Sequence, residues 1–201
     1  MAMQTYDSIR GTIDTGDVFL FSGRGVMETA IKLFTLSKWS HVGMAVRVAG
    51  WDTLLIWEAN LSVADVLKGS GNGGLSLSLL SERVRSYQGD VAVRRLLNIN
   101  RTPARWQALC ALRSEIRGRP YEQSLLKLIK SAYDGPFGHN DEDLSSVFCS
   151  ELVAAALMAM GLLASDLPSS EYTPGDFSSA GQLNLLHGVV LGEEIVIAQQ
   201  S

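Results

Sequence analysis

The sequence predicts an α+β fold in one domain that spans residues 1–201. Short runs with the alternation or the β-branched content of strands fill most of the first half, and longer runs with helical spacing follow. Two of the strand-like runs are separated by only four residues, which indicates a hairpin. A chain of 201 residues with 46% hydrophobic and 19% charged residues is long enough to bury its own core.

The strand-like runs are bounded by turn-forming residues. The first ends at Gly23-Arg-Gly25, and glycine breaks the pattern there before a helical run begins. Glycine and polar residues alternate over 68–74, which we expect to be a loop that could overhang a cleft. We expect strands over residues 15–22, 41–48, 53–59, 75–79, 90–96, 188–191 and 194–198.

The helical runs have recognisable boundaries in two cases. Pro103 stands at the first helical position of a run that ends at Gly118. The run from 148 to 161 is strongly apolar and predicts a buried helix. Its longest apolar stretch, 152–164, is shorter than the roughly 18 residues that cross a membrane, so no transmembrane segment is expected. We expect a helical turn over 80–87 and helices over 26–36, 102–118, 121–133 and 148–161.

The charge of the chain argues against nucleic acid as a partner. The net charge is -4, with 17 basic and 21 acidic residues, and no long basic run is present. Residues 1–10 lack the charged start, apolar middle and small-residue cleavage site of a secretory signal, so we expect a cytoplasmic protein. Secretion by a non-classical route stays open, and the sequence gives no oligomeric state.

The two cysteines have different contexts. Cys149 stands at the expected start of the 148–161 helix, where unpaired N–H groups and the helix dipole stabilise a thiolate. It is therefore the candidate nucleophile, and a buried core thiol is the alternative. Cys110 lies in the middle of the helix over 102–118, on the same apolar stripe as Trp106 and Ile116, and we expect it in the core.

His41 and Glu58 supply a candidate base and its orienting group. His41 begins one strand of the expected hairpin and Glu58 ends the other, so their side chains meet if both face the same side. Glu58 sits among apolar residues, where a buried carboxylate needs a partner such as an imidazole. A histidine satisfied by the backbone and a glutamate that reaches solvent are the alternatives. Zinc held by these two residues and Cys149 is a further alternative, although no short-range pair of ligands supports it.

Five short motifs, taken in order, resemble one protein family. They are Gly16-Asp-Val-Phe-Leu-Phe, Trp39-Ser-His41-Val-Gly-Met, Trp57-Glu58-Ala, Gly118-Arg-Pro-Tyr121-Glu and Phe148-Cys149-Ser-Glu-Leu-Val. The chain resembles the circularly permuted branch of the NlpC-type papain-like cysteine peptidases and amidases, the YiiX/YebB-like branch, which is related to the lecithin:retinol acyltransferases. The order is specific, because the histidine precedes the cysteine here and follows it in the unpermuted relatives. The likeness extends to Thr173-Pro-Gly-Asp176.

The resemblance implies a permuted papain-like fold with an antiparallel, barrel-like sheet packed against the helix that carries the nucleophile. It maps a catalytic triad onto Cys149, His41 and Glu58, and it places Tyr121 and Tyr172 in segments that line the substrate pocket. No cofactor and no metal are expected.

The function that follows is that of a cysteine hydrolase. It would cleave an amide bond through a thioester acyl-enzyme, on a small peptide such as a cell-wall fragment. Family relatives also act on lipid acyl groups, so a lipid-directed thioesterase, amidase or acyltransferase is one alternative. A binding module without enzymatic activity is the other. The expected partner is a small peptide or an acyl-group substrate.

Overall fold

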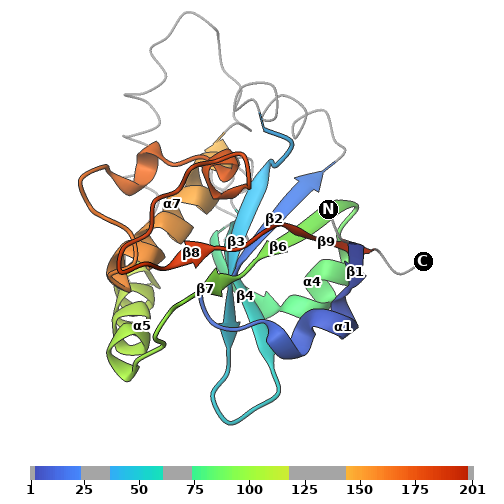
Figure 1. Ribbon diagram of the computed structural model, residues 1–201, viewed down its shortest axis with the longest axis horizontal. Coiled ribbons are helices and arrows are strands. Elements are labelled where there is room, and N and C mark those ends of the chain that lie inside the picture. The colour runs from blue at the N-terminus through green and yellow to red at the C-terminus, as the bar shows by residue number, and fades with distance from the viewer. Residues whose placement is uncertain (1–2, 24–36, 61–73, 118–143, 199–201) are drawn as a thin grey trace, which may run out of the picture.

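The computed structural model describes residues 3–23, 37–60, 74–117 and 144–198, which form the coloured ribbon of Figure 1. Four expectations lie outside these residues. They are the helix over 26–36, the loop over 68–73, the helix over 121–133 and the pocket residue Tyr121.

The described residues combine strands and helices in the predicted α+β class. The strands are β1 (Met3–Thr5), β2 (Val18–Gly23), β3 (His41–Arg47), β4 (Leu54–Asn60), β5 (Gly74–Leu79), β6 (Gly89–Arg94), β7 (Leu96–Leu97), β8 (Val190–Leu191) and β9 (Ile195–Ala198). The α-helices are α1 (Tyr6–Ile9), α4 (Leu80–Ser86), α5 (Pro103–Arg117) and α7 (Leu144–Ala159). Three short 3-10 helices are η1 (Arg10–Thr12), η2 (Ser169–Glu171) and η3 (Pro174–Phe177). Each expected strand is present to within about three residues at either end.

Seven strands form one mixed sheet in the order β1-β9-β6-β2-β3-β4-β5. Every neighbouring pair is antiparallel except β1 with β9, which is parallel. The expectation of a purely antiparallel sheet is therefore wrong at this edge, because three residues without alternation give no strand signal in the sequence. The sheet is also open and not barrel-like over the described residues, where its edges β1 and β5 do not pair with each other.

Helices cover both faces of the sheet (Figure 1). α7 packs on β3 and β4, while α4 lies against β4 and β5 on the other face. Along β2, Val18 and Leu20 join the core that contains α7, and Phe19 and Phe21 join the core that contains α4. The strand register therefore decides which helix each side chain of the sheet can meet.

α5 has the predicted bounds, but its buried stripe differs from the prediction. Leu109 is buried, and Leu112 and Ile116 pack against the same core. These positions follow the helical spacing of three and four residues, which places Cys110 about a quarter turn away from them. Cys110 is exposed, so its assignment to the core is wrong. Trp106, placed on the same stripe, is 40% exposed.

Gly43 of β3 makes room for neighbouring side chains of β4. A Cβ at this position would lie 2.8 Å from Cδ1 of Ile56 and 3.3 Å from Cβ of Glu58. Gly43→Ala is therefore expected to lower the free energy of unfolding by about 1–3 kcal/mol, because a packed core must shift to accept the methyl group. Denaturant unfolding checks this beside Gly11→Ala, where no atom lies within 4 Å of the added Cβ. Equal midpoints for the two variants would contradict it.

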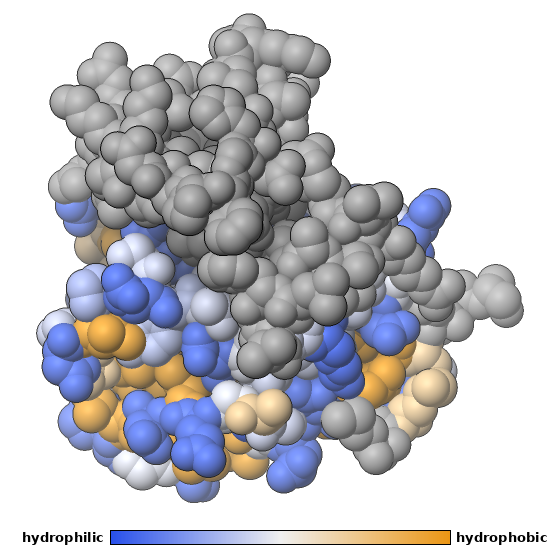
Figure 2. Space-filling model, turned by 90° about the horizontal axis from the view of Figure 1, so that it is seen from above, coloured by the Kyte–Doolittle hydropathy of each residue, from blue (hydrophilic) through white to orange (hydrophobic). Residues whose placement is uncertain are grey.

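The surface formed by the described residues is mixed in character. In Figure 2, hydrophilic and hydrophobic residues lie side by side wherever these residues are visible, as is usual on surfaces in contact with water. Within the described ranges, none of the helices has both the length and the apolar character needed to cross a membrane.

Candidate active site

His41 and Glu58 are in direct contact. Nε2 of His41 lies 2.7 Å from Oε2 of Glu58. In the register of β3 and β4, Met44 lies opposite Trp57, and continuing this register places Glu58 opposite Gly43. His41 is therefore the diagonal neighbour of Glu58 on the same face of the sheet, within reach for long side chains.

Arg83 holds the other oxygen of Glu58. Its Nε donates a hydrogen bond of 2.8 Å to Oε1, and the Glu58 side chain is only 1% exposed. The guanidinium lies over two rings, 4.8 Å from the centroid of Phe21 and 5.0 Å from that of Tyr87. Both carboxylate oxygens are thus engaged, and the orientation of Glu58 is fixed.

The surroundings of Glu58 keep it ionised. Burial raises the pKa of the Glu58 carboxyl, but the hydrogen bonds and charges of His41 and Arg83 outweigh burial and hold the pKa below its ordinary value. Sequence reasoning missed Arg83. A signal was available, because a carboxylate expected in an apolar strand requires a cation, and Arg83 falls in the helical turn that directly follows the next strand.

His41 also meets Cys149, which forms a hydrogen bond with its ring. Since Nε2 is engaged with Glu58, Nδ1 is the ring nitrogen left available for the sulfur. Burial lowers the pKa of His41, but the Cys149 sulfur and Glu58 outweigh burial and raise the pKa to about 9. The structure therefore brings together the three residues that the sequence selected and adds Arg83 as a fourth.

Cys149 does not stand at the start of its helix. α7 begins at Leu144, five residues earlier, so the expected position at the helix N-terminus is wrong. The prediction began the helix at the continuous apolar run from 148 and left out Leu144 and Val147, which are apolar but have two serines between them. The helix dipole acts mainly on the first turn, and only the first backbone N–H groups of a helix lack partners. Because Cys149 lies beyond the first turn, neither the dipole nor these N–H groups stabilise its thiolate or an oxyanion beside it. The Cys149 side chain is fully buried.

Tyr172 lies close to the nucleophile along the chain that returns after α7. The hydroxyl of Ser150, the residue after Cys149, donates a hydrogen bond to the backbone carbonyl of Tyr172. The Tyr172 ring is partly exposed and lies 6.2 Å from that of Phe177. Beyond it, a cavity of about 350 Å³ lies between residues 37–39 and 173–181. Its two walls are continuous in sequence with His41 and with Tyr172.

Metal ligation was the remaining alternative for the same residues. In the described part of the chain, no three His, Cys, Asp or Glu side chains form a group that could hold a metal ion, and this includes His41, Glu58 and Cys149. Of the other two histidines, His187 is exposed and His139 lies outside the described residues.

Comparison with known proteins finds a similarity in structure alone. No family model matches it, and no curated protein matches it. Its structure is similar to that of the metalloprotein YiiX from Escherichia coli O157:H7 (DUF1105), with 20% sequence identity and a TM-score of 0.47. The similarity covers 94% of this chain and 98% of the other.

Proposed function

We propose that the protein is a cysteine hydrolase of the permuted papain-like type that cleaves an amide bond. The observation that carries this proposal is the continuous chain of contacts from Arg83 through Glu58 and His41 to Cys149, in which Glu58 and Cys149 are buried. A nucleophile, a base in contact with it and a group that orients the base are the components of covalent acyl transfer. A site of four engaged polar side chains is also costly to bury for packing alone.

The proposed reaction has two halves. In the first, Nδ1 of His41 takes the proton of the Cys149 thiol, the sulfur attacks the amide carbon, and the imidazolium gives its proton to the departing amine. In the second, His41 takes a proton from water, whose oxygen attacks the thioester carbon, and the thiol is restored as the acid leaves. Glu58 accepts a hydrogen bond from Nε2 throughout, which keeps Nδ1 available as the base.

The proposed substrate is a small peptide such as a cell-wall fragment, as the family resemblance implies. The cavity between residues 37–39 and 173–181 supports it, because its volume of about 350 Å³ lies in the range of small-molecule sites. Its lining includes Trp39, Lys38, Asp176 and Glu194, which suit a polar ligand better than an acyl chain. Of the apolar segments that would favour a lipid substrate, 26–34 lies outside the described residues. In 75–80, Leu80 is fully buried in the core, while Leu77 and Leu79 are 37% and 42% exposed.

Titration of His41 by nuclear magnetic resonance tests the proposed pair. The wild-type imidazole is expected to hold its proton up to about pH 9. The Cys149 sulfur makes the largest contribution that raises the pKa of His41 against the lowering effect of burial. Cys149→Ala removes this sulfur, so the pKa of His41 is expected to fall in that variant. The His41→Ala variant assigns the resonance of His41, because that resonance is missing from its spectrum. The ionisation of Cys149 is followed in parallel by the ultraviolet absorbance of its thiolate, which needs no reagent to reach the buried sulfur.

The alternatives give different titrations. In a binding module whose thiol does not pair with His41, the pKa of His41 would lie near its ordinary value of about 6.5. Cys149→Ala would leave that pKa unchanged. That result would refute the assembled pair and the hydrolase with it. Titration does not distinguish an amide substrate from a lipid acyl substrate, and measured turnover of each substrate does.

A further inference from the structure

A second cavity lies at the far end of β3 from the candidate active site. Its volume is about 240 Å³, and Arg47, the last residue of β3, lines it. His41 is the first residue of the same strand, so the two places are separated by six residues, or about 20 Å. The cavity is lined by Arg47, Arg101, Arg105, Thr15, Thr102 and Trp106, among others. We call it the arginine cavity.

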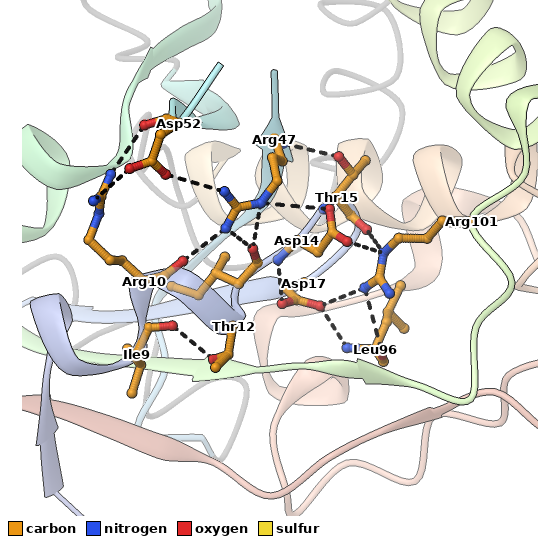
Figure 3. A network of polar contacts seen from close by, with 11 residues as sticks. Ile9, Arg10, Thr12, Asp14, Thr15, Asp17, Arg47, Asp52, Leu96 and Arg101 are labelled. Carbon is orange, nitrogen blue, oxygen red and sulfur yellow. Dashed lines mark hydrogen bonds and ion pairs between the residues drawn. The ribbon is translucent and has the colours of Figure 1, made fainter. Parts of the chain in front are cut away.

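Backbone carbonyls hold the three guanidinium groups of the arginine cavity in place, as Figure 3 shows for two of them. Arg47 donates from Nε to the carbonyl of Ile13 at 3.0 Å, and Arg101 donates from Nε to that of Thr15 at 3.0 Å. Arg105 donates from Nε to the carbonyl of Met160 at 3.1 Å. These bonds orient the cations before any ligand arrives, which lowers the entropic cost of binding.

Donors remain available after these bonds are made. Within the described residues, Nη1 of Arg101 and Nη2 of Arg105 have no hydrogen-bond partner. The hydroxyl oxygens of Thr15 and Thr102 accept backbone N–H groups, from Arg47 at 3.0 Å and Arg105 at 3.3 Å. Each hydroxyl therefore keeps its own hydrogen for donation. Four donors of this kind on one cavity suit the oxygens of an anion.

Acidic neighbours offset the positive charge only in part. Asp14, on the cavity wall, lies 3.4 Å from Nε of Arg101 and 4.0 Å from Nε of Arg47. Asp17 pairs with Arg101, and Asp52 pairs with Arg47 and with Arg10 outside the cavity. The whole cluster thus holds four arginines against three aspartates, and one positive charge is in excess.

The remaining wall is apolar. The indole of Trp106 is 40% exposed although it belongs to a helix packed on α7, and Met160 lies beside it on the lining. A flat apolar group placed against an exposed indole removes both surfaces from water. The wall therefore adds a preference for an anion that carries such a group.

We propose that the arginine cavity binds a small oxyanion, a phosphate monoester or a carboxylate, with its oxygens on Arg101, Arg105 and the threonine hydroxyls. A flat apolar part of the ligand lies against Trp106. The site is independent of the proposed hydrolase chemistry, because it shares no residue with the candidate active site and lies at the opposite end of the sheet.

Isothermal titration of the full chain with phenyl phosphate, inorganic phosphate and benzoate tests this site. Saturable binding of one equivalent is expected for phenyl phosphate or for benzoate, and the stronger of the two identifies the oxyanion. Arg105→Gln is expected to weaken binding about tenfold, the loss of one charge-assisted hydrogen bond. Arg113→Gln is the matched control, since it removes the same charge from an exposed position of the same helix.

Two further measurements keep the outcome clear. Trp106→Ala is expected to weaken the binding of phenyl phosphate and to leave the binding of inorganic phosphate unchanged. Should Arg105→Gln fold poorly, amide shifts of the wild-type protein on addition of phosphate are expected at Thr15, Thr102 and Arg105. Saturable binding of none of the three probes, or equal weakening by Arg105→Gln and Arg113→Gln, would overturn the proposal.

Discussion

Cys149→Ala is expected to abolish amide hydrolysis, with a loss of at least about 10³-fold in kcat/KM. The sulfur forms the only bond between protein and acyl group in the proposed reaction, and removal of a nucleophile from a catalytic triad leaves little of the rate. Hydrolysis of a panel of small peptides, followed by mass spectrometry, measures the effect. A wild-type mass increased by the acyl group on Cys149 would show the thioester directly.

The second cysteine provides the control for this experiment. Cys110 is exposed on α5, so Cys110→Ser is expected to leave turnover unchanged while it removes the thiol that reagents reach most easily. The Cys149→Ala chain is expected to fold, because the change is small and the rest of the α7 core is kept. Full turnover by folded Cys149→Ala would exclude covalent catalysis at this residue.

Glu58→Gln is expected to reduce kcat by about 10³–10⁴-fold, through the tautomer of His41. Arg83 donates to Oε1 of Glu58, and it would hold the amide oxygen of the glutamine in the same place. The amide NH₂ would then face Nε2 of His41, which would have to accept and not donate. The ring proton would move to Nδ1, where Cys149 needs a base. The effect is measured with the same peptide substrates.

A second substitution separates this tautomer effect from simple loss of charge. In Glu58→Gln with Arg83→Met, the amide is free to turn its oxygen toward His41, so turnover is expected to recover about tenfold relative to Glu58→Gln alone. Arg85→Met on the same helix is exposed and serves as the control for loss of a positive charge. No recovery in the double variant would show that Arg83 does not orient the residue at position 58.

The sequence predicted the parts of the fold that depend on local pattern. The hairpin of β3 and β4 follows from two apolar strand-like runs on either side of a short turn, and that hairpin alone brings His41 to Glu58. The carboxylate of Glu58 required a cation, but Arg83 was missed because the choice of cation depends on how α4 folds back over the sheet, and no spacing in the sequence encodes that return. Parallel pairing of β1 with β9 joins the two ends of the chain, which is equally invisible to a local pattern.

Two errors have a common physical origin in the apolar pattern. Cys110 and Leu109 are adjacent in sequence, and the pattern could not decide which of two apolar stripes on α5 faces the core. The start of α7 was placed where the continuous apolar run begins, whereas its first turn also contains Ser145 and Ser146, which separate Leu144 from Val147. Helix phase and helix ends are set by tertiary packing and by caps, and a hydrophobic run reports neither.

The arrangement of Arg83, Glu58, His41 and Cys149 has a consequence for salt dependence. Their formal charges sum to zero when the proton is on the sulfur, and again when it has passed to the imidazole. Formation of the thioester, with the proton gone to the departing amine, leaves the sum at zero as well. A cluster that stays neutral through the cycle exerts little long-range field on an uncharged substrate, so kcat/KM for such a substrate should hardly vary with ionic strength.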